Sequence, residues 1–161
     1  MGERQEDRQF ADQRTGRNRG GETRLSDGFQ KAALPDPNGR VYEWQKAGAV
    51  KIPHRITMGD GLFFFAGLWE VWNEPGAGSL RSCTIITTTP NAVTAPIHDR
   101  MPVILDPEAQ RAWMSRETEL DELQRLLVPH STDGMRAYPV SKDVGKPQNQ
   151  SAALIEPVSA D

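Results

Sequence analysis

The sequence has little of what marks secreted or membrane proteins. Its single cysteine, Cys83, excludes an intrachain disulfide and fits a reducing compartment. The longest apolar run, residues 61–69, is too short to cross a bilayer. No basic-then-apolar leader stands at the N-terminus. We therefore expect a cytoplasmic protein that makes no membrane contact.

The motifs that hold nucleotides and metals are also missing. No GxGxxG follows a strand-like segment and there is no Walker-type loop, which argues against a nucleotide-binding α/β enzyme. The three histidines, His54, His98 and His130, are far apart, and none has a partner at metal-ligand spacing. We expect neither a cofactor nor a metal.

The composition is that of one domain with a modest core. The 161 residues are 37% hydrophobic and 25% charged, and 14 glycines with 12 prolines indicate many turns and short helices. The net charge of −3 argues weakly against nucleic acid. However, arginines gather within residues 14–24 and acidic residues within 106–122, and a locally basic face can still bind phosphates. We expect a monomer.

The chain divides into a polar N-terminal segment and a domain. Residues 1–24 are rich in arginine and glutamine and nearly free of apolar residues, so we expect them to be disordered when free. The domain is expected over residues 25–161. Residues 25–40 carry turn signals, of which Asp36-Pro37-Asn38-Gly39 is the strongest.

Four segments are typical of strands, and two others of short helices. The strands are expected at 40–46, 54–58, 62–72 and 81–89, with Gly59–Gly61 as a hairpin connector and 137–141 as an edge strand. Asp106 is expected to cap a helix that starts at Pro107, and Thr118 with Asp121 a second one. The apolar stripe of the second helix is expected to be Leu120, Leu123 and Leu127. The class is α+β: mainly antiparallel β with a few short helices.

The stretch "APIHDRMPVIL", residues 95–105, places three polar side chains between two prolines. His98 in such a stiff, charged turn is a candidate general acid or base, although a lone histidine is more often structural. Asp99 can orient His98 or pair with Arg100, and both alternatives stay open. Cys83 lies within a β-branched run, where we expect a small core residue.

A second candidate, Glu43, stands between Tyr42 and Trp44. In a strand the two aromatic residues face one way and the carboxylate the other. Such a carboxylate can lie in a partly dry pocket suited to acid–base chemistry, or it can face water while its neighbours pack the core. The tryptophans, Trp44 among them, can stack on bases, but core packing is the more common role.

Taken together, "VYEWQK", "FAGLWEVW", "SCTIITTTPNAVTAPIHDRMPVIL" and "AYPVSKDV…LIEPV" resemble the SOS response-associated peptidase family, also called abasic-site processing proteins. The resemblance runs from about Tyr42 to Val158 and implies that family's barrel- or sandwich-like β fold. It also implies a role in the DNA damage (SOS) response, association with the nucleoid, and single-stranded DNA with abasic sites as the partner.

The resemblance implies a covalent chemistry. Family members begin Met-Cys-Gly-Arg, and the freed cysteine condenses with the sugar aldehyde of an abasic site to a Schiff base and then a thiazolidine. By position, His98 resembles the histidine that shuttles protons at the sugar. Glu43 resembles the glutamate that assists imine formation, ring closure and crosslink reversal. Arg100 resembles an arginine that holds a phosphate, and Trp44 an aromatic residue that contacts bases.

This sequence departs from the family pattern near its start. It begins Met-Gly-Glu-Arg, so the amine of Gly2 can form an imine but no thiazolidine. In "NRGGET", Asn18 falls on the family's site asparagine, but Gly20 falls on its arginine. Either an insertion separates "SDGF" from "YEW", or sequence before "YEW" has been lost. We expect an impaired copy that lacks the usual N-terminal part of the domain. The alternatives are a non-catalytic DNA-binding remnant and a peptidase that uses His98 and Cys83.

Overall fold

The structure, a computed structural model, describes residues 30–36, 40–59, 62–74 and 78–158. The segment 1–24 and Asn18 therefore lie outside the described residues, as does "SDGF". The strands are β1 (Gln30–Asp36), β2 (Arg40–Ala47), β3 (Val50–Met58), β4 (Phe63–Glu74), β5 (Gly78–Ile85), β6 (Thr87–Thr88), β7 (Met101–Pro102), β8 (Ile104–Leu105) and β9 (Met135–Pro139). The helices are α1 (Pro107–Met114) and α2 (Leu120–Arg125), and two 3-10 turns follow, η1 (Lys142–Gly145) and η2 (Ala152–Ile155).

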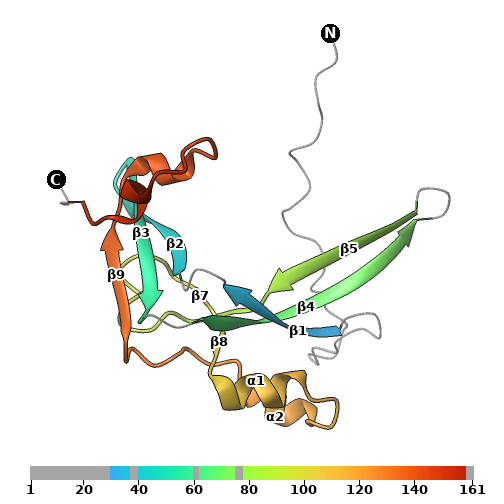
Figure 1. The fold of residues 1–161 in the computed structure, drawn as a ribbon. Helices are drawn as coiled ribbons and strands as arrows, with labels where there is room; N and C mark the ends of the chain where they lie inside the picture. The colour runs from blue at the N-terminus through green and yellow to red at the C-terminus, as the bar shows by residue number, and fades with distance from the viewer. Residues whose placement is uncertain (1–29, 37–39, 60–61, 75–77, 159–161) are drawn as a thin grey trace.

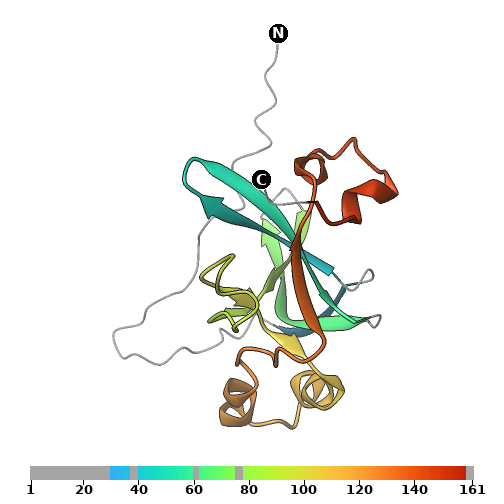
Figure 2. The ribbon, with the colours of Figure 1, turned by 90° about the vertical axis from the view of Figure 1, so that its left-hand side faces the viewer.

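Two antiparallel sheets carry most of the fold. The first has the order β1-β4-β5, with β8 also paired to β4, and the second has the order β2-β3-β9. A short pair, β6-β7, forms a separate two-stranded sheet. Both views place α1 and α2 at one end of the molecule and the C-terminal turns at the other (Figures 1 and 2). The expected class, mainly antiparallel β with a few short helices, is confirmed.

Strand β4 is the central strand of the first sheet. On one edge β1 pairs with it from Gln30 opposite Trp69 to Asp36 opposite Phe63. On the other edge β5 covers its distal half, and β8 pairs with Phe64 and Phe65. Beyond Trp69 the described residues leave β4 and β5 as a two-stranded hairpin, which extends away from the body in Figure 1.

The core has two parts, one between the sheets and one under the helices. The first cluster contains Ile56, Phe63, Phe65, Met101, Ile104 and Met135, drawn from both sheets and the β7–β8 segment. The second contains Ala66, Val103, Leu105, Trp113 and Leu123, and it attaches α1 and α2 to the first sheet. Because both clusters draw on residues 101–105, this short segment ties the two parts together.

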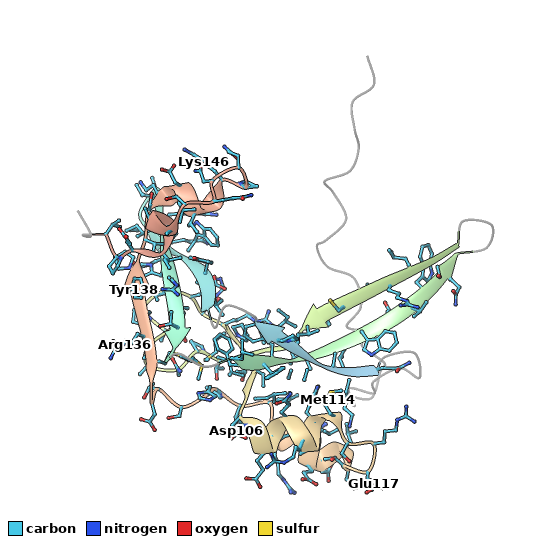
Figure 3. All side chains as sticks on the ribbon, viewed as in Figure 1. Asp106, Met114, Glu117, Arg136, Tyr138 and Lys146 are labelled. Atoms are coloured by element: carbon cyan, nitrogen blue, oxygen red, sulfur yellow. The ribbon has the colours of Figure 1, made fainter. Side chains whose placement is uncertain are left out.

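The first helix begins as its sequence predicts. The Asp106 carboxylate accepts hydrogen bonds from the backbone N–H groups of Glu108 and Ala109 at 2.9 and 2.8 Å, and Pro107 occupies the first turn. Asp106 lies where the chain enters α1, as Figure 3 shows. Among the helices of the described residues, none is long and apolar enough to span a membrane.

The expected cap of the second helix is wrong. Glu119 is the N-cap of α2 and makes no capping hydrogen bond through its side chain, whereas the Thr118 hydroxyl donates to the Ala112 carbonyl at 2.7 Å. Of the expected apolar stripe, Leu123 is buried but Leu120 is exposed. Leu127 is partly buried and packs against the same core cluster as Leu123, so two of the three expected positions face the core.

Three further expectations are wrong because they depend on how strands distant in the sequence pair with one another. Gly59–Gly61 does not connect a hairpin, because β3 and β4 belong to different sheets. Residues 30–36, which were expected to lie in turns, form strand β1, because they pair antiparallel with β4 at the edge of the sheet. Cys83 is exposed on β5 rather than buried, because few side chains cover the distal β4–β5 hairpin in the described part of the chain.

Candidate functional site

A cavity lies between the second sheet and the turn that follows β6. The empty space at this site, including the part open to solvent, is about 320 Å³. Its wall comes from β2 and β3, from the turn and β7–β8, and from β9. The lining residues are Val41, Glu43, Ile56, Thr94, Ile97, His98, Arg100, Met101, Pro102, Ile104 and Met135. Four of them, Ile56, Met101, Ile104 and Met135, are also core residues, so the cavity has an apolar floor.

Glu43 reaches this cavity because of the alternation along β2. Val41 and Glu43 line the cavity, and side chains two residues apart in a strand share a face. Glu43 pairs across the sheet with His54, and the strand partner of Val41 is Ile56, another lining residue. The side chain of Glu43 is half-buried. The register of β2 against β3 thus places a carboxylate at the rim of an apolar pocket.

The turn that carries His98 is organised by Asn91. The Asn91 side-chain oxygen accepts from the N–H groups of Val93 and Thr94, both at 3.1 Å, and from the Thr94 hydroxyl at 3.2 Å. Its amide nitrogen donates to the His130 carbonyl at 3.0 Å. The Thr94 carbonyl then accepts from the His98 N–H at 3.0 Å. One amide side chain therefore shapes the turn and joins it to the segment that leads to β9.

His98 has two competing partners at one ring nitrogen. Its Nδ1 lies 3.0 Å from Asp99 Oδ1 and 3.2 Å from the Arg100 backbone nitrogen. A carboxylate only accepts and an N–H only donates, so Nδ1 is protonated in the first contact and bare in the second. In neutral His98, Nε2 is a base in the first arrangement and a donor in the second. This environment suits a side chain that must both take and give a proton.

The same geometry shows which side chain Asp99 contacts. Its carboxylate contacts the His98 ring, and no carboxylate of the described residues pairs with the Arg100 guanidinium. Arg100 is exposed and also lines the cavity. A planar, permanent cation at the opening of a pocket is suited to a phosphate.

The structure brings together three of the five expected site residues, and a fourth, Asn18, lies outside the described residues. Glu43, His98 and Arg100 line one cavity. Trp44 follows Glu43 in β2 and so projects from the other face of the sheet, where it is 39% exposed, and it does not line the cavity. Cys83 lies on β5, opposite Trp69, and does not line the cavity either. A hydrolytic pair of His98 and Cys83 therefore has no support in the described structure.

Two polar residues of the site escaped the sequence reasoning. Thr94 is 3% exposed and lines the cavity through a side chain bonded to Asn91. The Gln45 amide donates to the Pro96 carbonyl at 2.9 Å and so connects β2 to the turn. The position of Gln45, two residues after Glu43 in a strand, was a usable signal. The carbonyl that it reaches was not visible in the sequence.

The chain resembles known proteins over most of its described length. Residues 39–147 match the family described as "SOS response associated peptidase (SRAP)". The chain is 48% identical over 123 residues to abasic site processing protein YoqW of Bacillus subtilis, a match that covers 74% of this chain and 55% of that protein. Abasic site processing protein YedK of Escherichia coli is 34% identical over 120 residues, which cover 73% and 54% of the two chains.

A solved structure has a similar fold. A protein from Bacteroides thetaiotaomicron superposes with a TM-score of 0.74 at 29% identity, over 80% of this chain and 57% of that one. The chain spans about half the length of the curated relatives that it matches. Its similarity to them lies in the part that contains the cavity, because the matched family region includes Glu43, His98 and Arg100.

Proposed function

The chain belongs to the SOS response-associated peptidase family, and from that membership we propose that it processes abasic sites in single-stranded DNA. The open-chain sugar of the lesion enters the cavity beside Glu43, His98 and Arg100. One observation supports the proposal: Glu43, His98 and Arg100, which come from two elements distant in the sequence, line one largely apolar cavity. The matched relatives are named abasic site processing proteins.

The chemistry proposed for this pocket is imine formation. A primary amine attacks the C1′ aldehyde carbon and gives a carbinolamine, which then loses its hydroxyl as water to form the C=N bond. The hydroxyl needs a proton in order to leave, and the nitrogen must lose protons to a base. His98 and Glu43 supply these transfers. The amine that the family resemblance implies is the N-terminal one, which lies outside the described residues.

Arg100 holds the DNA in this proposal. Its guanidinium pairs with the phosphate next to the lesion, and this contact contributes affinity without reading the base sequence. The apolar floor of Ile56, Met101 and Ile104 receives the sugar carbons and limits competing water. These roles can be tested separately, because DNA binding depends on Arg100 and the proton transfers depend on His98 and Glu43.

The first experiment compares two single-stranded oligonucleotides, one with a single abasic site and one intact. The protein is incubated with each in the presence of cyanoborohydride, which reduces an imine to a stable amine, and the products are separated on a denaturing gel. We expect a shifted band with the abasic oligonucleotide alone. Equal yields from both oligonucleotides, or salt-sensitive binding without any trapped product, would refute the proposed chemistry.

Variants then separate the roles. Glu43→Gln is expected to slow trapping by about 100-fold or more, the usual contribution of a positioned acid–base group. The matched control is Glu156→Gln, an exposed glutamate outside the cavity. Arg100→Ala is expected to weaken binding and to reduce the slope of log affinity against log salt by about 1. Its control is Arg125→Ala on α2. Equal behaviour of each variant and its control would remove that residue from the mechanism.

A further inference from the structure

The hydrogen bond from Gln45 to Pro96 joins the two elements that supply the acid–base pair. Gln45 lies two residues after Glu43 on β2 and therefore on the same face of the sheet. Its Nε2 donates to the Pro96 carbonyl at 2.9 Å. Pro96 precedes His98 by two residues. A single side chain thus spans from the strand of Glu43 to the turn of His98.

The short segment between Pro96 and His98 is stiff, so a displacement at one end reaches the other. The N–H groups of Ile97 and His98 both donate to the Thr94 carbonyl, at 2.9 and 3.0 Å. The φ angle of Pro96 is restricted by its ring. The backbone that carries His98 therefore continues directly from the Pro96 carbonyl through a hydrogen-bonded turn.

The other hydrogen bonds of the turn lead elsewhere. Asn91 bonds to the His130 carbonyl, and the nearby Thr88 hydroxyl bonds to the Leu127 carbonyl at 3.2 Å. Among the hydrogen bonds of the described residues, the Gln45 amide makes the one that joins β2 to the turn. We propose that Gln45 is a positioning residue, which fixes the separation of the Glu43 carboxylate and the His98 imidazole across the cavity.

The bond is exposed, and this separates its effect on geometry from its effect on folding. An exposed hydrogen bond contributes little to the free energy of unfolding, because water replaces the lost partner when the bond breaks. The chemistry is more sensitive, because a displacement of about 1 Å can cost about 100-fold in rate. The inference rests on the proposed function for its kinetic consequence, but the tether itself can be tested without any reaction.

The test uses the whole chain and two variants. Gln45→Met keeps the length of the side chain and removes the donor. The control is Gln124→Met, an exposed glutamine on α2. The measurements are the NMR signals of the His98 ring and of the Ile97 and His98 amides, the affinity for abasic single-stranded DNA, and the rate of cyanoborohydride trapping.

We expect Gln45→Met to shift and broaden the His98 signals and to slow trapping by about tenfold, with DNA affinity unchanged. Gln124→Met should resemble the parent in all three measurements. His98 signals that stay in place in Gln45→Met would overturn the tether, whatever the trapping rate. Shifted signals with an unchanged rate would overturn the positioning role. Absence of trapping in the parent would overturn the proposed function, and the spectra would still decide the tether.

Discussion

Replacing Trp113 should test whether the helices are held to the sheet as the structure indicates. Trp113 lies on α1 and is 2% exposed, in a cluster with Ala66, Val103 and Leu105. Its indole N–H donates to the Ala32 carbonyl on β1 at 3.0 Å. One side chain therefore combines a large buried apolar surface with a hydrogen bond to the edge strand of the first sheet.

Both contributions can be given magnitudes. Trp113→Ala removes a buried aromatic side chain, which typically costs about 3–5 kcal/mol of unfolding free energy. Trp113→Phe keeps much of the apolar volume but removes the donor to Ala32, and a polar group left without its partner costs about 1–3 kcal/mol. The total free energy of unfolding of a small domain is about 5–15 kcal/mol. The alanine variant should therefore be only marginally stable, and the stability of the phenylalanine variant should lie between that of the alanine variant and that of the parent.

Urea unfolding followed by far-UV circular dichroism measures these changes, since the remaining tryptophans would complicate a fluorescence signal. The matched control is Trp72→Ala, because Trp72 is 46% exposed on the distal hairpin and its loss should cost about 0.5 kcal/mol or less. A loss below about 1 kcal/mol for Trp113→Ala would refute the packing described for this cluster. So would equal losses for Trp113→Ala and Trp72→Ala.

Three further predictions concern single positions. Gly67→Ala should destabilise the chain by about 1–3 kcal/mol in urea unfolding, since the new Cβ would lie 2.9 Å from the Thr84 carbonyl oxygen; an unchanged midpoint would contradict this. Asp106→Ala should cost about 0.5–2 kcal/mol through the lost cap, and Asp106→Asn much less. The hydrogen bond from Lys146 and its charge lower the pKa of Asp143, so Asp143 should titrate below its ordinary range by NMR and return upward in Lys146→Ala. Because that pKa is depressed, any stability from the pair is present above the unfolded pKa and is lost as pH falls through the folded one.

The sequence signals for the candidate site residues were local. The prolines and charges of residues 95–105 pointed to His98 and Arg100, and the alternation around "YEW" pointed to Glu43. The structure places these three residues along one cavity, and their roles there stay a prediction. Gln45 and Thr94 were missed because their partners, the Pro96 carbonyl and the Asn91 side chain, become visible only once the turn is folded against the strand.

The sequence by itself determined the features that act within a few residues. These are the strand segments, the Asp106 cap with Pro107, and the stiff turn around His98, because capping, turn and alternation preferences are short-range. Tertiary structure decided which strands share a sheet, that Cys83 is exposed, and that Glu43 lines one cavity with His98 while Trp44 does not. Those outcomes depend on which apolar faces bury each other across long separations in the chain, and short-range preferences do not specify that choice.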